Sequence, residues 1–260
     1  MRQRFTCDTL KTAPPVRVAR RTGGDALEPH TGLVAMHMSD GIVDAPTSVI
    51  FGLVAVLGLA VCVARARRDL DDRTAPMAGL VAAFVFAVQM LNFPILPGVS
   101  GHLLGGALCA ILVGPYVGAV CVSIVLLLQA LLFADGGLSA LGTNITNMAL
   151  LGTFVGYGVA VAMRRIATRS RGGLVLTAFV AAWVNTVVAS LGFVLEYAIG
   201  GEGLALGTVL GLMTGFHALI GIGEGIITAL TVGAVASVRP DLVHLTRSAT
   251  PSLTITGVRA

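Results

Sequence analysis

The chain has 260 residues, of which 55% are hydrophobic and only 12% are charged. Its mean hydropathy is +0.90. Soluble domains carry about 25% charged residues, so the composition excludes an ordinary soluble domain. Because apolar runs of around 20 residues recur along the chain, we expect an all-α polytopic membrane protein. The net charge of +4 comes almost wholly from arginine, and we interpret the arginine clusters as topology signals rather than as a nucleic-acid surface.

Residues 1–35 precede the first apolar segment. They contain six basic residues but no apolar core of signal-peptide length. Their composition favours a disordered basic extension. A second interpretation is that translation begins at Met36 and that residues 1–35 are not made.

Seven apolar segments follow, at residues 47–66, 76–93, 103–114, 116–133, 144–163, 174–199 and 206–238. The third segment is short for a membrane span and ends at Pro115. In transporters, short segments interrupted by Gly and Pro border the substrate site. We assign residues 36–240 to one transmembrane domain and residues 241–260 to a polar cytoplasmic tail.

Arginines cluster at 65–73 and 164–171 and recur at Arg239 and Arg247. Such residues favour the cytoplasmic side of a membrane. About seven transmembrane helices then predict an outer N-terminus and a cytoplasmic C-terminus, with the Met36 arm and the loop before His102 both on the outer face. The six basic residues of the N-terminal extension would then lie on the outer face, against this rule. This conflict supports a start at Met36.

A start at Met36 would place three nitrogen donors on one short arm: the α-amine of Met36, the amide nitrogen of His37 and the His37 imidazole. Folded around one divalent ion, they close a five-membered and a six-membered chelate ring, and His102 can fill the remaining in-plane position. Nitrogen donors in a square-planar arrangement suit Ni²⁺ and Cu²⁺, and Co²⁺ is next to them in the affinity order. A Met-His pair alone is a weak motif, so the metal prediction depends on both histidines sharing the outer face.

Four further residues are candidates for supporting this site. Asp40 is the nearest carboxylate and is expected to orient the arm as a hydrogen-bond acceptor. Ser100 lies in the same loop as His102, while Asn144 and Asn147 begin the fifth segment, from which they could reach that loop. The two asparagines have an equally good explanation as polar residues at a helix start.

His217 and Glu224 are seven residues apart in the last segment, so they lie on one helix face. Ionisable residues within a span are costly and indicate either a function or a structural hydrogen bond between helices, with Asn185 or Gln129 as a partner. We expect two acidic residues near the predicted outer boundary to be solvated: Glu196 and Glu202.

The sequence also bears on partners. Small residues in the second segment form two AxxxA spacings, a plausible flat face for docking another membrane subunit: Ala78, Ala82, Ala83 and Ala87. No HExxH, P-loop or GxSxG motif is present, so we expect a transporter subunit without its own ATPase rather than an enzyme. Any dependence on ATP must come from partners.

Several stretches resemble the CbiM/NikM substrate-binding subunits of energy-coupling factor transporters: MHMSDGI at 36–42, GVSGHLLGG at 98–106, LVGP at 112–115, QALLFADGGL at 129–138 and HALIGIGEG at 217–225. The resemblance runs from Met36 to about Val238. It implies that the Met36 α-amine, the His37 amide nitrogen and imidazole, and the His102 imidazole hold the ion. It also implies a CbiQ-type transmembrane coupling subunit, paired CbiO-type ATPases and often a small accessory membrane subunit.

The leading interpretation is a Co²⁺-capture subunit in the cell membrane of a prokaryote, feeding an ATP-driven importer that supplies cobalamin synthesis. Ni²⁺ uptake by the same architecture is the runner-up, because the ligands do not separate the two ions. In both cases the ion is a substrate rather than a cofactor. A self-sufficient secondary transporter, with His217 and Glu224 in a proton relay, is a different class. An intramembrane metalloenzyme would lack a general base, since Asp40 is the only nearby carboxylate.

Overall fold

A computed structural model describes residues 37–72, 74–96 and 99–247, all within one compact unit that spans residues 32–260. The predictions for residues 1–35, for Met36, for the side chain of Ser100 and for residues 248–260 fall outside the described part.

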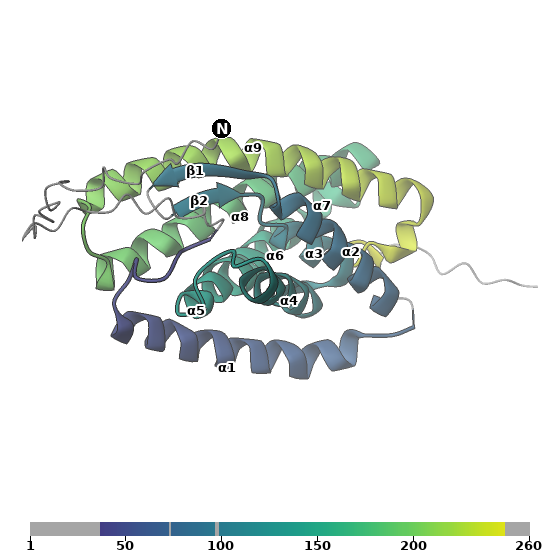
Figure 1. Cartoon of the computed structure of the whole chain (residues 1–260). Coiled ribbons are helices and arrows are strands. Elements are labelled where there is room, and N and C mark those ends of the chain that lie inside the picture. Colours follow the sequence, from purple (N-terminus) through teal and green to yellow (C-terminus); the bar gives the residue numbers. More distant parts are fainter. Residues whose placement is uncertain (1–36, 73, 97–98, 248–260) are drawn as a thin grey trace, which may run out of the picture. The chain divides into compact units, whose positions relative to one another are not determined.

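The described chain is mostly helical (Figure 1). The long helices are α1 (Ala45–Asp69), α4 (Pro115–Leu132), α8 (Arg171–Gly200) and α9 (Leu206–Val238). One further helical segment is continuous and consists of α5 (Leu141–Asn144), the π-helix η1 (Ile145–Gly152) and α6 (Thr153–Ala162). The shorter helices are α2 (Thr74–Gln89), α3 (Gly106–Val113), α7 (Arg164–Ala167) and the 3₁₀ turn η2 (Pro240–Leu242).

Each of the seven predicted segments is helical, but they differ in length. Within the described residues, five helical segments are long and apolar enough to cross a membrane: α1, α4, α5 to α6, α8 and α9. Helix α2 has 16 residues and α3 has only 8, which correspond to about 24 and 12 Å against a hydrocarbon core of about 30 Å. The protein is therefore a multi-pass helical membrane protein with five candidate spans.

The all-α prediction misses one small sheet. Strands β1 (Asn92–Leu96) and β2 (Val99–His102) form an antiparallel hairpin in the region predicted to be a loop, with Asn92 opposite His102. Pairing gives the backbone N–H and C=O groups of this segment partners that a loop near lipid would lack. It also places His102 at the end of β2.

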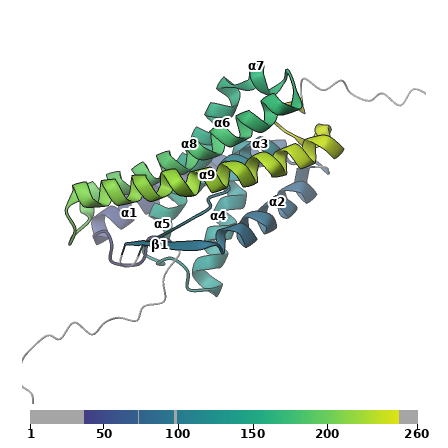
Figure 2. The ribbon, with the colours of Figure 1, turned by 90° about the horizontal axis from the view of Figure 1, so that it is seen from above.

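Helices α8 and α9 run side by side in both views and form the most extensive helix contact in the molecule (Figures 1 and 2). The two helices pack closely at positions where α9 has a glycine, which has no side chain to separate them. A Cβ atom on Gly225 of α9 would lie 2.7 Å from the Phe179 ring of α8, and one on Gly221 would lie 3.0 Å from Trp183. Close approach through small residues is the usual way in which helices associate in lipid.

The described arginines gather at one end of the bundle. Arg65 donates to Tyr116 Oη at 3.4 Å, which joins the end of α1 to the start of α4. Arg247 donates to Thr74 Oγ1 at 3.3 Å, which joins the C-terminal segment to the start of α2. The hairpin and residues 37–44 lie away from that end, between the left side and the middle of the view (Figure 1). The described molecule thus has one arginine-rich end and one end without arginine.

Packing continues past the predicted domain boundary at residue 240. The N–H groups of His244 and Leu245 donate to the carbonyl oxygens of Leu112 and Ile111, at 3.2 and 3.1 Å. These carbonyls lie in the last turn of α3, where helical partners are missing. Leu245 is buried in the core. The start of the predicted polar tail is therefore part of the folded unit.

The predicted small-residue face on α2 is divided between two sides of the helix. Ala78 is buried against the core and Ala82 is half-buried, while Ala83 and Ala87 are exposed. Docking of another subunit on this helix stays a prediction, and the structure leaves the 83/87 pair exposed for it.

Candidate metal centre

The arm that begins at His37 is fastened to the start of the 141–162 helical segment. Asn144 Oδ1 accepts from the Met38 N–H at 3.2 Å, and Asn144 Nδ2 donates to the Met38 carbonyl at 3.2 Å. The same carbonyl accepts from the Gly137 N–H at 3.0 Å. Asn144, which we expected to reach the loop of His102, therefore holds the arm instead.

Two glycines in the loop after α4 let the arm lie directly on that loop. Gly136 has φ +84°, and a Cβ atom there would lie 2.8 Å from His37 Cβ. A Cβ atom on Gly137 would overlap Asp40. Asp40 Oδ1 accepts from the Ser139 N–H at 2.8 Å and from the Ser139 hydroxyl. The hydrogen bond from the Ser139 hydroxyl lowers the pKa of Asp40, so this carboxylate stays ionised as a tether between arm and loop.

The two predicted imidazoles lie together. The ring centroids of His37 and His102 are 4.5 Å apart, with an angle of 53° between their planes. Both side chains are buried, at 3% and 4% exposure. His102 Nδ1 donates to the Leu103 carbonyl at 2.8 Å, so Nε2 has the lone pair that a metal ion needs.

The environment of His102 favours its neutral form. Burial, followed by the charge of the neighbouring His37, lowers the pKa of His102 well below its usual value. A neutral imidazole is the form that binds a metal ion, so His102 would need no deprotonation to do so at neutral pH.

His37 differs from the predicted chelate in one respect. Its Nδ1 donates to Asp135 Oδ1 at 3.1 Å, and its Nε2 is buried without a hydrogen-bond partner. A six-membered ring that includes the His37 amide nitrogen requires Nδ1 as the ligand. Rotation of the imidazole by a half-turn about Cβ–Cγ would exchange the sides on which the two nitrogens lie.

Asp135 is the residue that the sequence reasoning missed. It is 7% exposed and lies in the loop between α4 and α5. A carboxylate that accepts from a ligand histidine fixes the ring and raises its basicity. The signal available was this carboxylate beside two glycines in a loop between two apolar segments.

A small cavity continues inward from the histidine pair. His37, His102, Asn144, Asn147 and His217 contribute to its lining. His217 Nδ1 donates to the Met213 carbonyl at 2.8 Å within its own helix. The structure thus brings His217 to the same cavity as the two predicted ligands.

His217 and Glu224 do not form the predicted pair. Glu224 accepts from Asn185 Nδ2 at 3.2 Å, as one of the structural alternatives expected. It also accepts from Thr186 and from two main-chain N–H groups beyond His102. His217 bonds within its own helix instead, so a shared face did not mean a shared hydrogen bond.

The prediction for Glu196 is wrong, because this residue is fully buried rather than solvated. Asn147 Nδ2 donates to Glu196 Oε2 at 2.6 Å. The donor belongs to the π-helical stretch η1, a geometry that often occurs at functional sites. Glu202 is exposed, as expected. Asn147 therefore supports a buried carboxylate at the edge of the cavity.

Side chains alone do not complete a metal site. Within the described ranges, no group of three or more His, Cys, Asp or Glu residues is arranged to hold an ion. The predicted chelate draws its other donors from the His37 amide nitrogen and the α-amine of Met36, and Met36 lies outside the described residues.

Comparisons with known proteins agree with this fold and site. The family model CbiM, described as a cobalt uptake substrate-specific transmembrane region, matches residues 37–242. A putative fused nickel transport protein NikMN from Archaeoglobus fulgidus is 41% identical over 210 residues, which cover 80% of this chain and 68% of that protein. A putative metal transport protein from Haloquadratum walsbyi is 38% identical over 208 residues, which cover 80% of this chain and 93% of that protein.

The same likeness extends to three dimensions. A crystal structure of a truncated transition metal transporter matches with a TM-score of 0.72 at 29% identity, covering 78% of this chain and 99% of that one. The family model spans both histidines, the hairpin and every candidate span. The chain belongs to the CbiM family of cobalt and nickel uptake membrane proteins.

Proposed function

We propose that this chain is the substrate-capture subunit of an energy-coupling factor importer, and that it binds Co²⁺ from the outer side of the cell membrane of a prokaryote. The observation that supports this most directly is the buried pair of imidazoles, His37 and His102, which lie 4.5 Å apart. They belong to the arm and the hairpin, which lie away from the arginine-rich end (Figure 1). Arginine-rich ends favour the cytoplasm, so the histidine pair would face outward and the C-terminal segment inward.

The proposed ligands are the Met36 α-amine, the His37 amide nitrogen, His37 Nδ1 and His102 Nε2. The buried Nε2 of His37 without a partner is consistent with a ring that turns on binding. After that turn, Asp135 would accept from His37 Nε2, and Nδ1 would face the ion. The carboxylate would then serve the same ring in both states.

The choice of Co²⁺ follows the description of the family model as cobalt uptake. A set of nitrogen donors would suit Ni²⁺ equally well, and the 41% identical relative is named as a nickel transport protein. Ni²⁺ is therefore the second candidate. Competition between the two ions for the purified protein would decide between them.

For partners, we propose a CbiQ-type coupling subunit, CbiO-type ATPases and a small accessory membrane subunit. The support is the family membership together with the lack of a P-loop in the sequence. The alternative class, a proton-coupled secondary transporter, relied on a relay between His217 and Glu224. Each of these residues has its own separate hydrogen-bond partners. Uptake that persists in cells without the ATPases would favour that alternative.

The site itself is tested by titrating Co²⁺ into the purified chain that begins at Met36. His102→Ala should abolish tight binding, because it removes one of the two imidazoles. His244→Ala is the matched control, since this histidine lies at the arginine-rich end beside Tyr157. The proposal is wrong if His102→Ala binds Co²⁺ as tightly as the unaltered protein. His217→Ala, in the same cavity, should leave most of the affinity intact.

A further inference from the structure

The two peptide groups on either side of Leu104, directly after His102, are hydrogen-bonded at both their N–H and their C=O. The Leu103 carbonyl accepts from His102 Nδ1 itself at 2.8 Å. The Leu104 N–H donates to Glu224 Oε2 at 2.6 Å, and the Leu104 carbonyl accepts from Gln89 Nε2 at 2.7 Å. The Gly105 N–H donates to Glu224 Oε1 at 2.9 Å. Two helices distant in sequence, α2 and α9, therefore fix the segment that presents His102.

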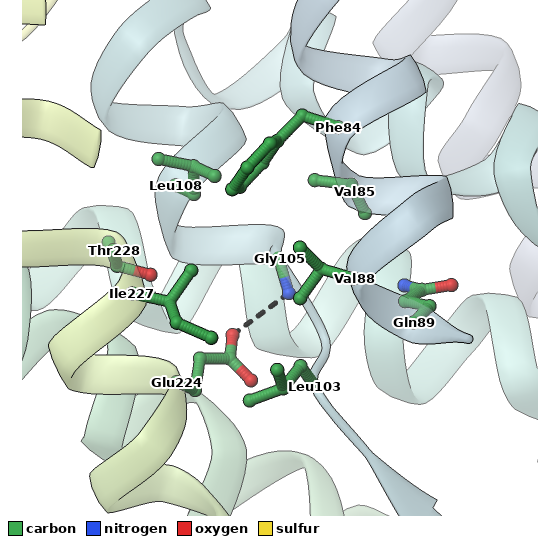
Figure 3. A pocket seen from close by; sticks show the side chains of 10 residues that line it. All are labelled: Phe84, Val85, Val88, Gln89, Leu103, Gly105, Leu108, Glu224, Ile227 and Thr228. Atoms are coloured by element: carbon green, nitrogen blue, oxygen red, sulfur yellow. Dashed lines mark hydrogen bonds between the residues drawn. The ribbon is translucent and has the colours of Figure 1, made fainter. Parts of the chain in front are cut away.

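The carboxylate of Glu224 can hold the main chain after His102 because both of its oxygens accept hydrogen bonds. Its two oxygens accept from four donors: the N–H groups of Leu104 and Gly105, Asn185 Nδ2 and Thr186 Oγ1. The side chain is 2% exposed. Figure 3 shows Glu224 pointing from α9 toward Gly105, within a cavity whose ten lining residues include no basic side chain. A buried carboxylate in such surroundings depends on hydrogen bonds for its stability.

The two N–H groups that Glu224 serves have no helical partner, because they precede the first turn of α3. Gly105 also has φ +77°, and a Cβ atom there would lie 2.6 Å from Val85 of α2. The close contact with Val85 keeps the segment between His102 and α3 from shifting toward α2. The positive φ of Gly105 keeps this residue from joining α3 as a helical residue.

Helix α9 also contacts the chain on the other side of His102. A Cβ atom on Gly101 would lie 2.5 Å from Ile220 Cδ1, so the strand lies directly on α9 there. Ile220 and Glu224 are one helical turn apart. One face of α9 thus contacts residues immediately before and after the proposed ligand.

We propose that Glu224 and Gln89 are positioning residues for His102: together they fix the Leu104 peptide groups and thereby hold His102 Nε2 toward His37. This inference rests on the proposed function, in which His102 is a ligand. Ligand distances in metal sites vary by only about 0.2 Å, so a small shift of this segment changes the geometry at the ion. The clamp formed by Glu224 and Gln89 acts through the main chain and does not touch the ion.

Glu224→Gln is the sharpest test. The Leu104 and Gly105 N–H groups bond to different carboxylate oxygens, and an amide keeps only one oxygen as an acceptor. The other N–H group would face an NH₂ donor, so the segment must move. Loss of a residue that orients a metal ligand typically lowers affinity by about 10- to 100-fold. We expect a loss of that size for Ni²⁺ and Co²⁺ by calorimetry, together with a shifted visible absorption band of bound Ni²⁺.

Thr177→Val is the matched control. Thr177 is buried in α8 and its hydroxyl bonds only to the Gly173 carbonyl of the same helix. The Thr177→Val variant should keep the affinity for Ni²⁺ and Co²⁺ and the visible absorption band of bound Ni²⁺. The proposal is overturned if Glu224→Gln, with a thermal unfolding midpoint of the ion-free protein near that of the unaltered chain, binds with unchanged affinity and spectrum. A loss of affinity with an unchanged band would also overturn it, since the ligand would then not have moved.

If Glu224→Gln does not fold, Gln89→Met decides, because methionine matches the shape of glutamine but cannot donate to the Leu104 carbonyl. A several-fold loss of affinity with a shifted band supports the clamp, and unaltered binding refutes it. His102→Ala is measured alongside. Should His102→Ala retain binding, the proposed function fails; should only the Glu224 and Gln89 variants retain it, the clamp alone fails.

Discussion

Gly136→Ala tests whether the arm of His37 must lie against the loop after α4. Gly136 has φ +84°, and the added Cβ atom would lie 2.8 Å from His37 Cβ, whereas ordinary contact begins at 3.4 Å. The arm would have to move by about 0.6 Å, the difference of these distances, which is about three times the tolerance of a metal–ligand distance. We expect the affinity for Co²⁺ to fall by at least about 10-fold, or about 1.4 kcal/mol.

The variant also strains the backbone, and that effect must be separated from the contact. A residue with a side chain in the left-handed region costs about 1–2 kcal/mol. Gly203 offers the same strain without the contact, because it has φ +98° and a Cβ atom there would meet nothing within 4 Å. Gly203→Ala should lower the thermal unfolding midpoint by a similar amount and leave Co²⁺ affinity unchanged.

Calorimetric titration of the two variants, with unfolding midpoints measured on the ion-free proteins, gives the comparison. Equal affinities for Gly136→Ala and Gly203→Ala would refute the reasoning, because the contact with His37 would then have no effect on the ion. A loss in both variants would attribute the effect to stability instead.

Three further predictions concern the acceptor of His37, the amine of Met36 and the orientation in the membrane. Asp135→Asn should weaken ion binding by about 10- to 100-fold in the same titration, because a neutral amide is a poorer acceptor for a ligand imidazole; unchanged affinity would count against the carboxylate. The form that begins at Met36 should bind tightly and a form that retains residues 1–35 much more weakly, since acylation removes an amine whose pKa is near about 8; equal affinities would exclude that amine as a ligand. Cysteine substitutions at Leu138 and Arg169 should be labelled only from outside and only from inside, respectively; the reverse pattern would refute the proposed orientation.

Much of the fold could be predicted because apolar length and arginine placement are local signals. All seven apolar segments are helical, and the described arginines lie at one end. The hairpin of β1 and β2 gave no such signal. Pro94 lies within a strand, where proline normally argues against one, and the pairing of β1 with β2 depends on the backbone rather than on a side-chain pattern.

The part of the site that could be predicted consists of histidines, because an imidazole is a common metal ligand. His37 and His102 were predicted from their donor atoms together with a shared outer face, and the structure brings their rings together. Asp135 was not, because its contact with His37 joins residues 98 positions apart. Glu196 was assigned to solvent from its place near a predicted boundary, but its face of α8 is turned toward Asn147. Glu224 has main-chain partners, which no side-chain pattern reveals.

The two proposed ligands are held by different parts of the fold. His37 depends on the loop and helix start that follow α4, through Asp135 and Asn144. His102 depends on α2 and α9, through Gln89 and Glu224. The short contact between the rings exists only because these two groups of elements pack together. An ion bound as proposed would therefore join them, and its affinity would report how they are placed. Changes that shift α9 against α4 should then weaken binding even when both histidines are unaltered.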